Sequence, residues 1–242
     1  MIEFSANEFA IAFLIGLVPA LFWLWFWLRE DKERPEPLLL VAIAFVAGMA
    51  VVPLALPLQS AAISIYQGNN LMWVWVVIEE VLKYAAALLV VLWNREVDEP
   101  IDFVIYLIAI ALGFAALENA LFLLTPLVNS EIATLAVTGS FRFLGATLLH
   151  VLCSATIGVA LAFAFYKSRL WRVIYGTVGL FIAILLHGWF NFFIMRAAEP
   201  GLDRANELLI VFLFVWMGII VLFLLFEKIK LLESLHKPLI RK

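Results

Sequence analysis

Three charged residues, Glu79, Glu80 and Lys83, lie in the middle of an apolar run, residues 71–93, that is long enough to span a membrane. On membrane-insertion scales, three charges at a helix centre cost about 7–11 kcal/mol, whereas the twelve Leu, Ile and Val residues of this run return only about 4–7 kcal/mol. This helix is therefore a poor membrane span on its own. It must face a protein interior or a wet cavity, where ionisable groups are candidates for a functional site.

The composition excludes an ordinary soluble domain. Of the 242 residues, 66% are hydrophobic and only 14% are charged, whereas soluble domains have about 25% charged residues. A spanning helix needs roughly 20 apolar residues, and seven such runs occur, at 8–28, 38–58, 71–93, 102–128, 141–166, 173–195 and 208–226. The sequence predicts an all-α, multi-pass transmembrane bundle of about seven helices, forming one domain over residues 1–242 with a motif core at 71–195.

Lysine and arginine residues separate by loop, which predicts the orientation. The loops after the first, third and fifth runs and the C-terminal tail hold 12 of them, whereas the N-terminus and the other loops hold 2. By the positive-inside rule, the N-terminus lies outside and the C-terminus in the cytoplasm. The tail, residues 227–242, mixes basic residues with leucines and is expected either to lie along the cytoplasmic headgroups as an amphipathic segment or to be solvated.

Polar residues also occur in three later apolar runs. They are Glu118 and Asn119, one turn after Phe114 in GFAALEN, the isolated His150, and His187 and Asn191 in HGWFN. At 1.5 Å per residue from the outer end of each run, the acids and imidazoles of all four runs lie roughly 10–15 Å deep. Unrelated packing residues would not share one depth. The pattern therefore predicts a single site in the outer half of the bilayer.

Each of these groups also has a structural interpretation. In a helix, Lys83 lies one turn from both Glu79 and Glu80, so that the three can form an ion-pair cluster that only fixes packing. Glu118 can serve as a further partner of Lys83, and an isolated histidine is commonly a hydrogen-bonded packing residue. Two carboxylates beside one lysine nevertheless leave a surplus acid, which a purely structural pair does not need.

Glutamates and histidines at one depth suit general acid–base chemistry. Hydrolysis of a peptide bond needs a base for water, an acid for the leaving amine and a donor for the developing oxyanion. Glu79 or Glu80, together with Glu118, would supply the base and the acid. His187 and Asn191, four residues apart on one helix face, would supply the oxyanion donors.

Zinc chemistry is the alternative use of the same residues. His150, His187 and a glutamate, with Glu118 as the expected third ligand, would bind the metal and leave another acid as the base. The histidines lack any zinc-type spacing, which favours the metal-free glutamate mechanism. Cys153 and Ser154 lie one turn from His150 but are weaker nucleophile candidates, since such residues usually pack or bond to their own helix.

The order of these motifs resembles a known family. The matching elements are Glu79-Glu80-x-x-Lys83, Phe114-x-x-x-Glu118-Asn119, the isolated His150, His187-x-x-x-Asn191, and the acidic, proline-containing stretch 31–37. Over residues 31–191 the chain resembles the PrsW family of intramembrane proteases, within the wider group that includes the type II CAAX prenyl proteases. The CAAX branch has Glu-Glu-x-x-x-Arg and Phe-x-x-x-His, where this chain has Lys83 and Glu118.

The resemblance implies a multi-pass endopeptidase of the cell (inner) membrane that cuts other membrane proteins, such as a membrane-anchored anti-sigma factor. Its expected partners are the lipid bilayer and a substrate with a transmembrane segment. No block of basic residues interleaved with aromatics suggests nucleic acid. The rival functions are a proton-coupled transporter or channel and a scaffold that binds a partner's transmembrane helix. The shared depth and the lack of repeated halves argue against transport.

Overall fold

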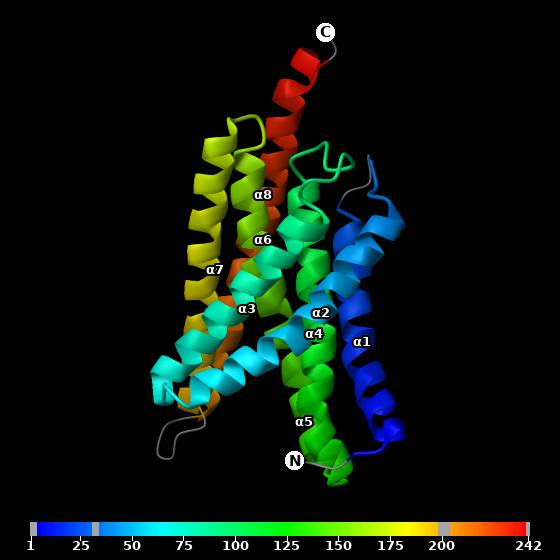
Figure 1. Cartoon of the computed structure of the whole chain (residues 1–242), viewed down its shortest axis with the longest axis vertical. Coiled ribbons are helices and arrows are strands. Elements are labelled where there is room, and N and C mark those ends of the chain that lie inside the picture. The colour runs from blue at the N-terminus through cyan, green and yellow to red at the C-terminus, as the bar shows by residue number, and fades with distance from the viewer. Residues whose placement is uncertain (1–3, 31–33, 198–203, 241–242) are drawn as a thin grey trace.

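The chain folds into a helical bundle, described by a computed structural model over residues 4–30, 34–197 and 204–240. No strand occurs in these ranges, and the N- and C-termini lie at opposite ends (Figure 1). The helices are α1 (Ala6–Leu28), α2 (Leu38–Ile63), α3 (Gly68–Val90), α4 (Asp102–Val128), α5 (Ile132–Phe141), a π-helical turn η1 (Arg142–Ala146), α6 (Thr147–Phe163), α7 (Arg169–Ala197) and α8 (Arg204–Ile240). The all-α expectation is confirmed. Residues 31–33 of the motif stretch 31–37 lie outside the described ranges.

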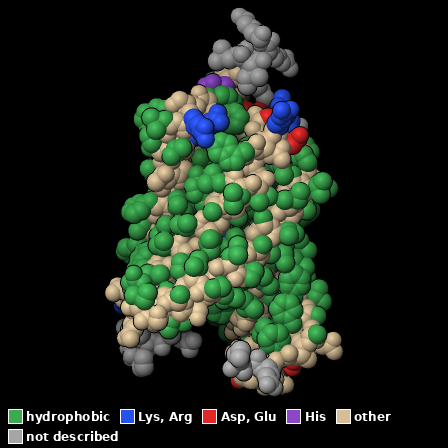
Figure 2. Space-filling view, in the orientation of Figure 1, with side chains coloured by type: hydrophobic (Ala, Val, Ile, Leu, Met, Phe, Trp, Pro, Cys, Tyr) green, Lys and Arg blue, Asp and Glu red, His purple; other side chains and the backbone are tan. Residues whose placement is uncertain are grey.

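The bundle has the dimensions and surface of a multi-pass membrane protein. Within the described ranges, six helical segments are long and apolar enough to cross a membrane. The seventh long helix is α3, which carries Glu79, Glu80 and Lys83 in its centre. Hydrophobic side chains cover most of the height of the face in Figure 2, and charged side chains gather toward its ends. Such a band is what a lipid-facing surface requires.

Helix α4 and the segment Ile132–Phe163 form the interior of the bundle. In α4 and in the segment Ile132–Phe163, 78% of the most apolar stretch is buried, against 22–44% in the other four candidate spans. Small residues let α2 and α4 cross closely, since a Cβ on Gly113 would lie 1.8 Å from the carbonyl oxygen of Phe45. This close approach is the use expected of small residues in membrane helices.

The fifth segment begins earlier than its apolar run. The run was expected at 141–166, but α5, η1 and α6 follow one another from Ile132 to Phe163 without a break. The π-helical turn η1 begins at Arg142, the one charged residue of the segment Ile132–Phe163. Single π turns inside α-helices are often found at functional sites. Here the turn places Arg142 beside α4.

The C-terminal tail continues α8 instead of turning away from it. Residues 219–237 contain neither glycine nor proline, so nothing in the sequence breaks the helix where the apolar run ends. In Figure 1, α8 rises beyond the other helices at the C-terminal end. Lys230 lies 3.2 Å from a carboxylate oxygen of Glu30, which ties this part of α8 to the end of α1.

Candidate active site

The predicted polar residues meet at a cavity of about 410 Å³ between α3, α4, η1, α6, α7 and α8. Its lining residues include five of the predicted groups, namely Glu79, Glu118, His150, His187 and Asn191. Gly68 and Leu71 also line it, so the cavity extends toward the start of α3, at the end of the bundle that holds the N-terminus (Figure 1). In the orientation predicted from the loop charges, with the N-terminus outside, this end belongs to the outer half of the bilayer.

Glu80 lies behind the cavity wall and connects two helices. Its side chain is fully buried, and its Oε1 lies 2.5 Å from Lys83 Nζ and 2.7 Å from His187 Nδ1. Because a carboxylate only accepts hydrogen bonds, Nδ1 of His187 carries the proton and donates it to Glu80. The other ring nitrogen, Nε2, therefore has a free lone pair, and it lies 3.8 Å from Glu79 Oε2.

Glu79 faces the cavity and is held from α2. Gln59 Nε2 donates a hydrogen bond of 2.8 Å to Glu79 Oε1, and the Trp75 indole donates one of 3.1 Å to the carbonyl oxygen of Gln59. The second oxygen, Glu79 Oε2, is buried and has no hydrogen-bond partner. An unpaired buried carboxylate oxygen is costly. Together with the free nitrogen of His187, it offers two adjacent donor atoms for a ligand such as a metal ion.

His150 bridges the two halves of the cluster. Its Nδ1 lies 3.2 Å from Lys83 Nζ, which must be the donor, and its Nε2 lies 3.1 Å from Glu118 Oε2, to which it donates. The imidazole also packs edge-on against Phe114, whose ring in turn lies 4.8 Å from Lys83 Nζ. Phe114 thus holds the lysine and the histidine in place.

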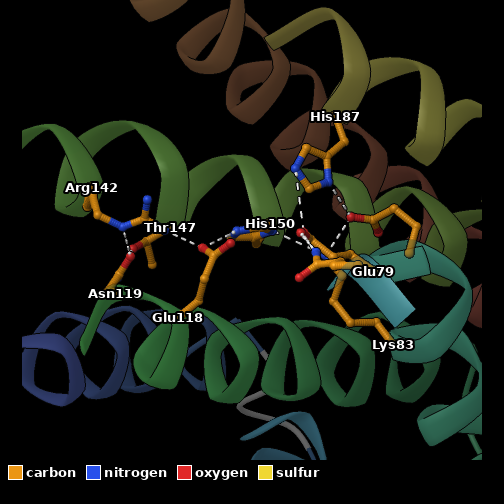
Figure 3. Close-up of polar contacts among 10 residues, drawn as sticks. Glu79, Lys83, Glu118, Asn119, Arg142, Thr147, His150 and His187 are labelled. Atoms are coloured by element: carbon orange, nitrogen blue, oxygen red, sulfur yellow. Dashed lines mark hydrogen bonds and ion pairs between the residues drawn. The ribbon is translucent and has the colours of Figure 1, made fainter. Parts of the chain in front are cut away.

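Glu118 is paired with an arginine and not with Lys83. The Arg142 guanidinium donates to Glu118 through Nη2 and to Asn119 Oδ1 through Nε, the latter at 2.5 Å. Asn119 donates in turn to Thr147 Oγ1 at 3.0 Å. Figure 3 shows the contacts as one row, running from Asn119 and Arg142 through Glu118 and His150 to the group around Lys83 and His187. The alternative structural interpretation, in which Glu118 pairs with Lys83, is therefore wrong, since Arg142 takes that place.

The donor groups of three residues fit a metal ion. Within the described part of the chain, Glu79, His150 and His187 form the group whose ligand atoms all lie within 4.8 Å of one another. The unpaired Glu79 Oε2 and the free His187 Nε2 are available as they stand, whereas His150 must give up one of its two contacts. One carboxylate and two imidazoles are a typical donor set for catalytic zinc. The third ligand expected from the sequence, Glu118, lies outside this group.

Three residues of the cluster were not predicted as site residues. Arg142 stood at the start of an apolar run, and only its charge in that position could have indicated a partner in the membrane. Gln59 fell one residue beyond the expected second run, in an expected loop, and Thr147 has no distinguishing pattern. The candidate nucleophiles Cys153 and Ser154 are buried, and neither lines the cavity.

An acid–histidine cluster inside a membrane bundle, reached by a cavity, is the kind of site that an intramembrane hydrolase needs, and the comparisons with known proteins agree. A family model described as "PrsW family intramembrane metalloprotease" matches residues 36–224. The chain belongs to this family, and it is an intramembrane protease.

Individual relatives are named as proteases of this family. The chain is 28% identical over 193 residues to "Protease PrsW" of Clostridioides difficile (strain 630), covering 76% of this chain and 79% of that protein. It is 28% identical over 185 residues to "Protease PrsW" of Bacillus subtilis (strain 168), covering 73% and 79% respectively. No solved structure matches the chain. The recognition from sequence motifs is thus confirmed by comparisons that extend beyond the motif residues.

Proposed function

We propose that this protein is a zinc-dependent endopeptidase of the cell (inner) membrane that hydrolyses membrane-anchored protein substrates at the cavity between α3, α4, α6 and α7. A membrane-anchored anti-sigma factor is the kind of substrate that the family resemblance implies. The observation that carries the proposal is the group of Glu79, His150 and His187, with an unpaired carboxylate oxygen and a free imidazole nitrogen facing each other at 3.8 Å. The description of the matching family as metalloproteases also supports it.

In this proposal Glu79, His150 and His187 hold the metal. When bound, zinc supplies a water of lowered pKa and polarises the scissile carbonyl. Glu80 keeps His187 in the tautomer that presents Nε2 to the cavity, as carboxylates behind metal-bound histidines commonly do. Gln59 fixes the orientation of the Glu79 carboxylate by donating a hydrogen bond to its other oxygen.

Glu118 is the residue proposed to move protons. It lines the cavity beside His150, so it accepts the proton of the attacking water and later returns it to the leaving amine. Arg142 holds this carboxylate from the π turn. Asn191 lines the same cavity, and its side-chain amide is proposed to donate to the oxygen of the tetrahedral intermediate.

The test is cleavage by purified protein in liposomes with a panel of purified single-span membrane proteins. We expect the wild type to cut at least one of them, and Glu79→Gln and Glu118→Gln to be slower by about 10²–10⁴-fold. Glu96→Gln, an exposed residue between α3 and α4, is the matched control and should retain full activity. Unchanged cleavage in both site variants would overturn the proposal, as would a wild type that cuts none of the panel.

A further inference from the structure

A second cavity reaches the same carboxylates from another side of the molecule. It measures about 340 Å³ and lies between α2, α3 and α4. It shares Trp75, Glu79, Glu118 and Phe122 with the first cavity, whereas the rest of its lining belongs to α2 and α4. The two cavities therefore meet at Glu79 and Glu118, the residues proposed to bind the metal and to move protons.

We propose that this second cavity is a substrate subsite, which binds an apolar side chain next to the scissile bond on the side opposite to the first cavity. The inference rests on the proposed function and adds to it the substrate feature that the enzyme selects. The first cavity then holds the chain on the other side of the bond. The bond to be cut lies where the two cavities meet.

The requirement for two cavities follows from the reaction. An endopeptidase cuts within a chain, so the substrate must continue on both sides of the reacting carbonyl. An extended chain advances about 3.3 Å per residue and points successive side chains in opposite directions. A site with one dead-end cavity would have room for one side only. Two cavities that join at the reactive carboxylates give each side of the bond its own space.

The lining of the second cavity defines the chemistry that it accepts. Val52, Ala55 and Leu56 of α2 and Phe114 and Leu121 of α4 contribute apolar surface. Apart from the two shared carboxylates, the polar side chains from α2 and α4 are Gln59, whose amide is already bonded to Glu79, and Thr125, whose hydroxyl is a polar group of modest size. A pocket of this kind favours a leucine or phenylalanine side chain over a small or charged one.

A lipid chain is the other occupant that such a groove can accept. The cavity between α6, α7 and α8, about 420 Å³ in volume, is also apolar but contains none of the proposed site residues. It therefore serves as the comparison for an apolar groove that lies away from the proposed site. The second cavity differs from it because Glu79 and Glu118 line it, and an apolar lipid chain forms no hydrogen bond with a carboxylate.

The experiment changes the size of the second cavity in both directions. Leu121→Ala enlarges it, and Thr125→Phe, at an exposed position on α4, fills it. A substrate that the wild type cuts is prepared with alanine, leucine or phenylalanine at each residue flanking the mapped scissile bond. We expect the ratio of kcat/KM for phenylalanine over alanine, at one flanking position, to rise about tenfold or more in Leu121→Ala and to fall about tenfold or more in Thr125→Phe.

The ratio separates specificity from damage, because a loss of folded protein lowers both rates equally. Leu186→Ala, in the cavity between α6, α7 and α8, is the control and should leave the ratio unchanged. If the wild type cuts the substrates but neither variant changes the ratio at any flanking position, the cavity is a lipid groove and the inference is wrong. If the wild type cuts nothing, the proposed function fails and this inference falls with it.

Discussion

Replacing Lys83 by methionine tests whether the buried ion pair holds the site together. Lys83 and Glu80 are both fully buried, with Nζ and Oε1 2.5 Å apart. At an effective dielectric constant of about 20, their attraction is about 7 kcal/mol. Methionine keeps the apolar stem but leaves Glu80 without its cation. Because His187 still donates to Glu80, the net loss should fall near the usual range for a broken buried pair, about 3–5 kcal/mol.

The assay is reversible unfolding in mixed detergent micelles, followed by circular dichroism. The double variant Glu80→Gln with Lys83→Met removes both charges and should be more stable than either single variant, since no buried charge remains unpaired. Lys167→Met, at an exposed lysine, should change stability by less than about 0.5 kcal/mol. A loss under about 1 kcal/mol in Lys83→Met, or additive losses in the double variant, would refute the reasoning.

Three further predictions concern the site and the topology. Gln59→Leu removes the donor to Glu79 Oε1 and should weaken zinc binding about 10–100-fold, measured by zinc titration of the metal-free protein. Leu58→Ala is the control and should leave the affinity unchanged. Equal zinc affinities of the wild type and Gln59→Leu would contradict the role of Gln59. Cys153→Ala and Ser154→Ala should both retain cleavage, because neither residue lines the cavity, and loss of cleavage in either would indicate a covalent mechanism. Cysteines placed in the loop 164–168, in a Cys153→Ser background, should react only from the cytoplasmic side, and labelling from outside would invert the topology.

The sequence predicts the helices well because hydrophobic runs of spanning length have few alternatives to helices in a membrane. Seven expected runs correspond to α1, α2, α3, α4, the segment Ile132–Phe163, α7 and α8. The largest difference in a start concerns Ile132–Phe163, where polar residues such as Thr138 and Ser140 interrupted the apolar run. A helix tolerates these residues, because Ser140 donates its hydroxyl hydrogen bond to the carbonyl oxygen of Ala136.

Most residues of the candidate site could also be predicted, Arg142, Gln59 and Thr147 excepted, because charged residues inside apolar runs are few and expensive. The contacts between these residues could not be predicted. Depth along each helix can be counted, but rotation about the helix axis and the distance between helices depend on packing. Lys83 was within reach of Glu79, Glu80 and Glu118, and only the bundle shows that it contacts Glu80 and His150 while Arg142 takes Glu118. For the same reason the sequence favoured Glu118 as the third ligand, whereas Glu79 lies with the two histidines.

The bundle also separates the two adjacent glutamates by role. They differ by about 100° around α3, so they face different surroundings. Glu79 lines both cavities, whereas Glu80 is fully buried against Lys83 and His187. In the proposed mechanism, Glu79 therefore binds the metal, and Glu80 fixes the orientation of His187.

Metal removal and restoration on the purified protein tests the central proposal most directly. After chelation to a zinc content below a few per cent, we expect cleavage of a single-span substrate to stop and to return with about one equivalent of zinc. Glu79→Gln should neither retain zinc nor regain activity. Full cleavage by wild-type protein shown to be free of metal would contradict the account, and would make Glu79 or Glu118 the base of a metal-free glutamate protease.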